Sequence, residues 1–305
     1  MTDSDTFLPV DARSTENPVH IGFLLIPDFA LLPYASTIEP LRAANRLSRR
    51  TLYRWSHVSL DGAPATASNG VSITADYGVG APVDFDYLFV CAGGNPAIFH
   101  HPASFAWLRR LARRGIALGG ISGGPYMLAR AGLLAGYRVT LHWEHAPAFR
   151  EEYPDLDLRR SLFEIDRGRL TAGGGTAPLD MMHVFISARH GAPLARAVSE
   201  WFLQTHVREG TEPQRMPLRE RIGVANPILL KAVEHMERHI EQPLAREAVA
   251  RLVQVSLRQL ERLFRTHLDR SMGDYYLGLR LERAAVLIRQ SSLSVLEVSL
   301  ACGFV

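Results

Sequence analysis

The sequence predicts a flavodoxin-like α/β domain, with a doubly wound and mostly parallel sheet, followed by an all-α domain. Residues 1–200 alternate short apolar, β-rich runs with helical patterns, which is typical of a parallel sheet covered by helices on both faces. Beyond residue 226 no convincing strand pattern occurs. Between the two parts, residues 208–226 combine proline, glycine and charge without apolar periodicity, which predicts a linker.

The predicted strands of the first part are short and apolar, and turn residues bound them. The first strand ends at Pro27-Asp28, and the last two form a hairpin around Arg167-Gly168. In chain order the strands cover residues 19–26, 53–60, 86–91, 116–121, 162–166 and 169–172.

Helical patterns separate these strands and fill the C-terminal part. Pro178 and Asp180 mark the first turn of a helix that reaches His190, because proline and acidic side chains are favoured there. The other predicted helices cover residues 31–47, 105–114, 123–131, 227–240, 244–253, 256–268, 273–289 and the residues from Val295 onward.

Composition and charge exclude several protein classes. The 305 residues are 47% hydrophobic and 21% charged, which is ordinary globular usage. No apolar run approaches the ~20 residues that a membrane span needs, residues 1–18 lack the layout of a signal peptide, and Cys91 and Cys302 lie far apart. We therefore expect a cytoplasmic protein. Residues 212–305 hold 14 basic and 11 acidic side chains, whereas residues 1–211 are balanced, which favours an acidic partner such as nucleic acid.

Two short predicted helices, residues 244–253 and 256–268, are separated only by Gln254-Val255. This spacing is typical of a helix-turn-helix, with Ser256 as the N-cap of the second helix. Its outward face carries arginine and glutamine, which can bind guanine and adenine edges in the major groove. These side chains are Arg258, Gln259, Arg262 and Arg265. The pattern alone leaves open a helical bundle with a solvated arginine face.

The run from Leu244 to Arg265 resembles the first helix-turn-helix of the AraC/XylS transcription factors. Residues 273–284 resemble the connecting helix of that family, and residues 294–304 resemble its second motif. The resemblance implies that Ser256 and the four outward side chains of residues 258–265 contact DNA. The chain stops at Val305, where the family continues into a second recognition helix. We therefore expect a truncated second motif or an unread half-site, and weak DNA binding.

A G-x-S-x-G pattern, Gly120 to Gly124, lies at a predicted strand-to-helix junction. A tight turn there would expose Ser122 as a candidate nucleophile and leave the following amide free for an oxyanion. His142, with Glu144 beside it, does not keep the hydrolase order of serine, acid and histidine. Glycine-rich strand ends also occur for close packing alone, so both interpretations stay open.

Residues 19–200 resemble the class I glutamine-amidotransferase-like, PfpI-type domain, and the whole chain resembles a GlxA-type regulator. Four segments carry this resemblance: residues 28–44, 90–95, 120–134 and 139–143. The resemblance implies a glutamate, Glu39, next to the nucleophile, and a loop of Gly93, Gly94 and Asn95 that closes the pocket. It also implies a cysteine at the elbow, where this chain has Ser122.

An alcohol needs an adjacent base to become a nucleophile, whereas a thiol is partly ionised near neutral pH. Glu39 and His142 are the candidates for such a base. The serine nevertheless favours a pseudo-enzyme domain that binds a ligand, with an amidase or peptidase-like hydrolase at Ser122 as the alternative. The expected ligand contacts are Glu39, Gly93, Gly94, Asn95, Ser122, Gly123, His142 and Trp143.

A small zwitterion suits these residue types. Backbone amides at 94 and 123 would bind a carboxylate, while Glu39 and aromatic faces, with Phe29 and Tyr34 nearby, would bind a cation. The run from Ser122 to His145 resembles regulators of quaternary-amine catabolism, with arginine regulators close behind. This implies glycine betaine, carnitine or arginine as the ligand.

Other motifs favour structural roles. His142 and His145 are three residues apart, but Trp143 between them indicates packing, so we expect no metal and no cofactor. Cys91 ends a buried strand as a small core residue. The run from Gly173 to Gly175 is predicted to be a tight turn beside the pocket.

Together these observations predict a ligand-responsive, DNA-binding transcriptional regulator. We expect a sensing domain over residues 19–207, a linker over 208–224 and a DNA-binding domain over 225–305. The expected partners are promoter DNA, a small-molecule effector, RNA polymerase and a second copy bound through the N-terminal domain, with no membrane. A dimeric scaffold that uses neither site is a third interpretation.

Overall fold

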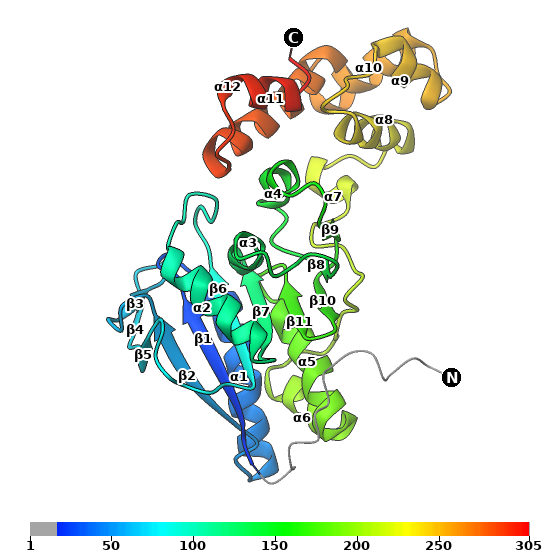
Figure 1. The fold of residues 1–305 in the computed structure, drawn as a ribbon. Helices are drawn as coiled ribbons and strands as arrows, with labels where there is room; N and C mark the ends of the chain where they lie inside the picture. Colours follow the sequence, from blue (N-terminus) through cyan, green and yellow to red (C-terminus); the bar gives the residue numbers. More distant parts are fainter. Residues whose placement is uncertain (1–16, 305) are drawn as a thin grey trace. The chain divides into compact units, whose positions relative to one another are not determined.

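A computed structural model describes residues 17–304 of the chain, so residues 1–16 and Val305 lie outside the described part. The chain divides into two compact units, with the boundary between Gln214 and Arg215. The first unit is an α/β sandwich and the second is helical (Figure 1). Each unit is described by itself below.

The sheet of the first unit has seven strands in the order β10-β11-β7-β6-β1-β2-β5. Only the β10–β11 hairpin is antiparallel, which confirms the predicted parallel α/β fold. Because β1 lies between β2 and β6, the strand order reverses there, and such a reversal places ligand sites at the carboxyl ends of the strands. The bounds are β1 (Val19–Leu25), β2 (Tyr53–Ser59), β5 (Tyr77–Gly78), β6 (Tyr87–Ala92), β7 (Ala117–Ser122), β10 (Phe163–Asp166) and β11 (Arg169–Ala172).

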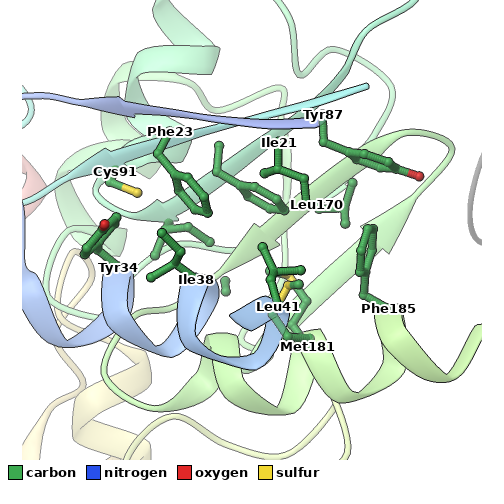
Figure 2. Packing of buried hydrophobic residues seen from close by; sticks show 14 of the residues in the cluster. Ile21, Phe23, Tyr34, Ile38, Leu41, Tyr87, Cys91, Leu170, Met181 and Phe185 are labelled. Carbon is green, nitrogen blue, oxygen red and sulfur yellow. The ribbon is translucent and has the colours of Figure 1, made fainter. Parts of the chain in front are cut away.

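Helices cover both faces of this sheet. On one face, α1 (Leu31–Ser48), α5 (Ala177–His190) and α6 (Ala192–Trp201) pack on the strands. Figure 2 shows Leu41 of α1 and Phe185 of α5 on the helix side of this core, with Ile21 and Tyr87 on the strand side. The other face is covered by α2 (Pro102–Arg113) and α3 (Gly124–Arg130).

The central strand explains why the two faces separate cleanly. Successive side chains of a strand point to opposite faces, so Ile21 and Phe23 enter one core and Leu24 enters the other. All seven residues of β1 are buried, as expected for a parallel strand with helices on both sides.

Several elements were not predicted from the sequence. Helix α2 begins at Pro102, three residues before the predicted start, because the His101 side chain caps it by accepting a hydrogen bond from the Ser104 amide at 3.2 Å. The unpredicted elements are α4 (Ala146–Glu152), α6, β3 (Ala65–Thr66), β4 (Ser72–Ile73), β5, β8 (Arg138–Val139) and β9 (Asp157–Leu158).

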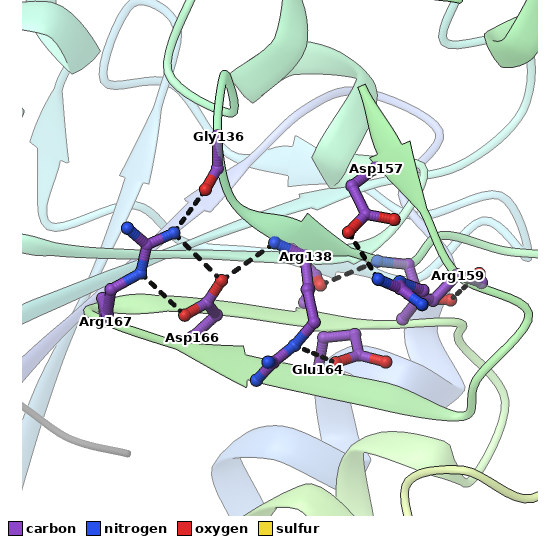
Figure 3. A network of polar contacts seen from close by, with 9 residues as sticks. Gly136, Arg138, Asp157, Arg159, Glu164, Asp166 and Arg167 are labelled. Carbon is purple, nitrogen blue, oxygen red and sulfur yellow. Dashed lines mark hydrogen bonds and ion pairs between the residues drawn. The ribbon is translucent and has the colours of Figure 1, made fainter. Parts of the chain in front are cut away.

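A polar network holds the β8–β9 pair against the edge of the main sheet (Figure 3). The Arg138 amide donates to Asp166 Oδ2 at 2.9 Å, and Arg167 Nε donates to Asp166 Oδ1 at 2.9 Å. Arg167 also donates to the Gly136 carbonyl. These contacts fix the start of the loop that follows β8 and carries His142.

The second unit consists of short helices around one apolar core. Leu229, Val249, Leu260, Phe264 and Met272 are buried in it. The helices are α7 (Leu218–Ile222), α8 (Pro227–Arg238), α9 (Arg246–Leu252), α10 (Leu257–Leu268), α11 (Met272–Gln290) and α12 (Val295–Ala301). Across residues 17–304, no helix combines the length and the apolar character that a membrane crossing requires.

The predicted linker over residues 208–224 is more structured than expected. Its first part packs on the α/β unit, where the Arg208 guanidinium pairs with the buried Asp180 at 2.6 Å and the Gly210 carbonyl accepts from the Leu162 amide at 2.7 Å. Its last part forms helix α7. The composition of a segment does not reveal such individual contacts.

Candidate functional site

Ser122 occupies a strained turn between β7 and α3. Its φ of +60° lies in the left-handed region, which costs a residue other than glycine about 1–3 kcal/mol. The turn also requires its glycines, since a Cβ at Gly124 would lie 2.0 Å from the Val90 carbonyl oxygen and one at Gly120 would lie 2.6 Å from the Pro125 nitrogen. The predicted tight turn is therefore confirmed, and it lies at the carboxyl end of the sheet.

His142 meets Ser122 at the glycine turn. A Cβ at Gly174 would lie 3.1 Å from Ser122 Oγ and 3.3 Å from His142 Cδ2, so both side chains lie against this glycine. The predicted turn of residues 173–175 beside the site is confirmed. Burial and the nearby His145 lower the pKa of His142, which favours the neutral imidazole near neutral pH. We call Ser122, His142 and Gly174, with Trp143, the elbow site.

The amide that follows Ser122 is already bonded. The Gly123 N–H donates to the Ala92 carbonyl at 3.0 Å, so it is not free for an oxyanion or a ligand carboxylate. The expectation that the amide at 123 binds a carboxylate is therefore wrong.

The loop after β6 is close-packed. A Cβ at Gly93 would lie 2.7 Å from the Asp28 carbonyl oxygen, and Gly94 has a φ of +57°. Asn95 Oδ1 accepts from the Ala97 amide at 3.1 Å. Each of these three residues therefore has a structural role in shaping the loop, and a ligand contact by any of them stays a prediction.

Glu39 pairs with a neighbour on its own helix, and the role beside the nucleophile that the resemblance implied stays a prediction. Its carboxylate accepts from Nε and Nη2 of Arg42, at 2.8 and 2.5 Å, on the same helix. Phe29 and Tyr34 differ from expectation, because they are 0% and 7% exposed and pack in the core. Burial raises the pKa of the Tyr34 hydroxyl, which hydrogen-bonds His57 Nε2 at 2.7 Å.

Trp143 is the aromatic side chain of the elbow site that solvent can reach, with 43% of its surface exposed. Its ring lies 5.4 Å from that of His142, and its backbone amide donates to Gln214 Oε1 at 2.8 Å. Gln214 was not a predicted site residue. It lies in a segment of linker-like composition, and nothing in that composition indicates a specific contact.

Two further predictions concern metals and thiols. Among residues 17–304 no group of three histidine, cysteine, aspartate or glutamate side chains is placed to hold a metal ion. Cys91 is 2% exposed and belongs to the core between the sheet and α1 (Figure 2), which confirms its structural role. Burial raises the pKa of its thiol.

Helix α10 presents a cationic face in the second unit. Leu260 and Phe264 are buried, and the outward side chains are exposed as predicted: Arg258, Gln259, Arg262 and Arg265. None of the salt bridges found in residues 17–304 involves these three arginines. Glu261, the acid of this helix, pairs with Arg246 at 3.4 Å. The face is therefore free to bind an anionic partner.

Ser256 is the N-cap of α10, as predicted. Its hydroxyl accepts from the Gln259 amide at 3.2 Å, so capping accounts for this serine, and a DNA contact by it stays a prediction. Ser294 forms a capping box with Glu297 at the start of α12, where the second motif was expected.

Comparison with known proteins agrees with both halves of the chain. The DJ-1/PfpI family model matches residues 28–188, and a helix-turn-helix domain model matches residues 249–305. HTH-type transcriptional regulator CdhR of Pseudomonas aeruginosa is 49% identical over 92% of this chain and 84% of its own length. HTH-type transcriptional regulator GlxA of Rhizobium meliloti is 46% identical over 96% of this chain and 91% of its own length.

A solved structure of an AraC family transcriptional regulator from Pseudomonas putida is 28% identical, with a TM-score of 0.56. It covers 61% of this chain and 100% of the solved chain. The chain therefore belongs to the family of HTH-type transcriptional regulators in which a DJ-1/PfpI domain precedes an AraC-type helix-turn-helix region.

Proposed function

We propose that this regulator senses a small zwitterionic metabolite in its α/β domain and activates the catabolism of that metabolite. In this proposal, residues 19–207 bind the effector and residues 225–305 bind promoter DNA, with residues 208–224 between them. The protein acts as a homodimer formed through the N-terminal domain and recruits RNA polymerase. The observation that carries the proposal is the exposed arginine face of α10, whose cations have no acidic partner in the salt bridges of the described residues.

Contacts at the elbow site support sensing over catalysis. A serine nucleophile needs a base and an oxyanion donor. The Gly123 amide is bonded to Ala92, and the Glu39 carboxylate is bonded to Arg42. Two of the groups that hydrolysis would use are therefore engaged in other contacts, although His142 lies near Ser122.

The solvent-exposed side chains at the elbow site favour a cationic group in the effector. The exposed face of Trp143 suits a quaternary or guanidinium cation through a cation–π contact. Glu144, whose side chain is 46% exposed, adds negative charge beside it. Glycine betaine, carnitine and arginine share this chemistry together with a carboxylate.

Ligand-observed NMR tests the proposal. The full chain is mixed with glycine betaine, carnitine, choline, arginine, glutamine and simple amides, and the spectra are followed for hours. Saturation transfer without new signals supports sensing, and Trp143→Ala should then weaken the transfer from a cationic ligand. New product signals that disappear in Ser122→Ala would instead establish the hydrolase alternative.

DNA binding is tested separately by fluorescence anisotropy with duplexes selected from random sequence by the protein itself. Arg262→Ala should weaken binding, while Arg238→Ala, on α8, serves as the matched control. Unchanged DNA affinity in Arg262→Ala would contradict the placement of α10 in the major groove. Absence of both ligand saturation and salt-dependent DNA binding would support the scaffold interpretation.

A further inference from the structure

Gln214 makes an unusual set of contacts for a residue between two domains. Its Nε2 lies 3.0 Å from Thr140 Oγ1, 3.0 Å from the Leu141 carbonyl oxygen and 2.6 Å from the Ser161 carbonyl oxygen. Its Oε1 accepts from the Trp143 amide at 2.8 Å. One side chain thus joins both sides of the loop that carries His142 to the segment before β10.

The Gln214 amide occupies space that exists because residue 173 has no side chain. A Cβ at Gly173 would lie 2.6 Å from Cδ and Nε2 of Gln214. Gly173 is followed by Gly174, which lies against Ser122 and His142. The amide therefore contacts two walls of the elbow site at once, the loop of residues 141–143 and the glycine turn.

The chain that leads to Gln214 is also held. We call residues 208–214 the edge segment, because it runs beside β10 at the edge of the sheet. Arg208 pairs with Asp180, and the Gly210 carbonyl accepts from Leu162. A Cβ at Gly210 would lie 2.9 Å from the Phe163 carbonyl oxygen, so the two backbones are in close contact. Gln214 is the last residue of the first unit, and the helical unit starts at the next residue.

We propose that Gln214 is a positioning residue of the elbow site and that its hydrogen bonds hold residues 212–216, where the chain passes into the DNA-binding unit. We call these residues the tether and the hydrogen bonds of Gln214 the latch. An effector that moves the loop of His142 and Trp143 changes the contacts of Gln214 and so releases or tightens residues 212–216. This regulatory half rests on the proposed function, whereas the latch itself concerns only the α/β unit.

Trypsin cleavage after Arg215 of the folded full chain measures the latch. Arg215 and Met216 are exposed, but a protease must also bind the residues before the cut in extended form, and Gln214 is anchored. Gln214→Ala should raise the cleavage rate about tenfold or more. Gln242→Ala, an exposed glutamine of the second unit, is the matched control, and cleavage after Arg238 is the internal reference.

Two variants separate hydrogen bonding from simple loss of bulk. Gln214→Glu keeps the shape but lacks the amide donors, so at pH 8 it should cleave as fast as Gln214→Ala. Near pH 5 a protonated carboxyl can donate, so the rate of cleavage after Arg215, divided by the rate after Arg238, should fall for Gln214→Glu and not for Gln214→Ala. Gly173→Ala should displace the amide and match Gln214→Ala. The double variant Gly173→Ala/Gln214→Ala should cleave no faster than either single variant. Additive effects, or rates equal to wild type, would overturn the latch.

Coupling to the elbow site is tested with His142→Ala, which removes a ring that lies against Gly174. It should also raise cleavage after Arg215, and the increase should vanish in the Gln214→Ala background. Unchanged cleavage in His142→Ala would overturn the coupling. Anisotropy on the same samples distinguishes this result from failure of the proposed function, since a wild type that cleaves slowly but binds no DNA would contradict only the latter.

Discussion

Replacing Arg208 with alanine should destabilise the first unit by about 3 kcal/mol. Asp180 is 0% exposed, and its carboxylate accepts from Arg208 Nε at 3.0 Å and Nη2 at 2.6 Å. It also accepts from Gln204 Nε2 at 2.7 Å and from the Arg208 amide at 2.9 Å. Arg208→Ala removes the two charged donors and leaves a buried anion with two neutral ones.

The magnitude follows from the burial of the two partners. Breaking a buried ion pair by removing one partner costs about 3–5 kcal/mol. The lower end applies here, because the side chain of Arg208 is 33% exposed and two neutral donors remain. For a unit of this size, about 3 kcal/mol lowers the melting temperature by roughly 6–12 °C.

Tryptophan fluorescence reports this change selectively. All four tryptophans lie in the first unit, at positions 55, 107, 143 and 201, so thermal unfolding followed by their emission does not register the helical unit. Arg196→Ala, an exposed arginine of α6, is the control and should stay within about 0.5 kcal/mol of wild type. Removing Asp180 as well should recover part of the loss. A melting temperature within 2 °C of wild type would refute the reasoning, because 2 °C is roughly a third of the smallest expected shift.

Three other perturbations give expected outcomes. Arg262→Ala should weaken DNA binding by about 1–3 kcal/mol with relaxed specificity if it reads a base, or lower the salt slope by about 1 if it binds a phosphate, as measured by anisotropy at several salt concentrations. Gly124→Ala should strongly lower the melting temperature followed by fluorescence, because its Cβ would lie 2.0 Å from the Val90 carbonyl oxygen. Gly278→Ala lies in α11, where the atom nearest to the new Cβ is 3.7 Å away. This variant should stabilise the helical unit by about 0.5–1 kcal/mol, as measured by circular dichroism. Burial lowers the pKa of His142, His57 and His190, so each of them binds a proton less readily in the folded than in the unfolded protein. The free energy of unfolding should therefore be highest above pH 6.5 and decrease as the pH falls below that value. His190→Gln should reduce the slope of this decrease.

The sequence predicted the sheet because its strands are apolar runs of the length and spacing that only a buried parallel strand explains. It also predicted the turn at Ser122 and the outward face of α10, since both depend on local periodicity and on glycine. Short strands such as β8 and β9 were missed, because two paired residues leave no periodic pattern.

Contacts between residues that lie far apart in the chain could not be predicted from the sequence. Glu39 was expected beside Ser122, and its ion pair with Arg42, three residues along the same helix, was not predicted from the sequence. The Gly123 amide was expected to be free, but its bond to Ala92 depends on the neighbouring strand β6. Gln214 could not be found at all, because its role depends on a missing side chain at position 173 that lies 41 residues away.

The hydrogen bonds of Gln214 are strong enough to carry an allosteric signal without any rearrangement of the sheet. Its amide offers two N–H donors and an acceptor, and each bond contributes about 0.5–1.5 kcal/mol net, or roughly 1.5–4.5 kcal/mol together. Typical coupling between two sites is about 1–3 kcal/mol, a change in affinity of about 5–150-fold. A ligand shifts an equilibrium only by its differential affinity for the two states. An effector that contacts Trp143 or His142 therefore needs to disfavour only the bonded position of one loop, and by reciprocity DNA that prefers the released tether must raise effector affinity by the same factor.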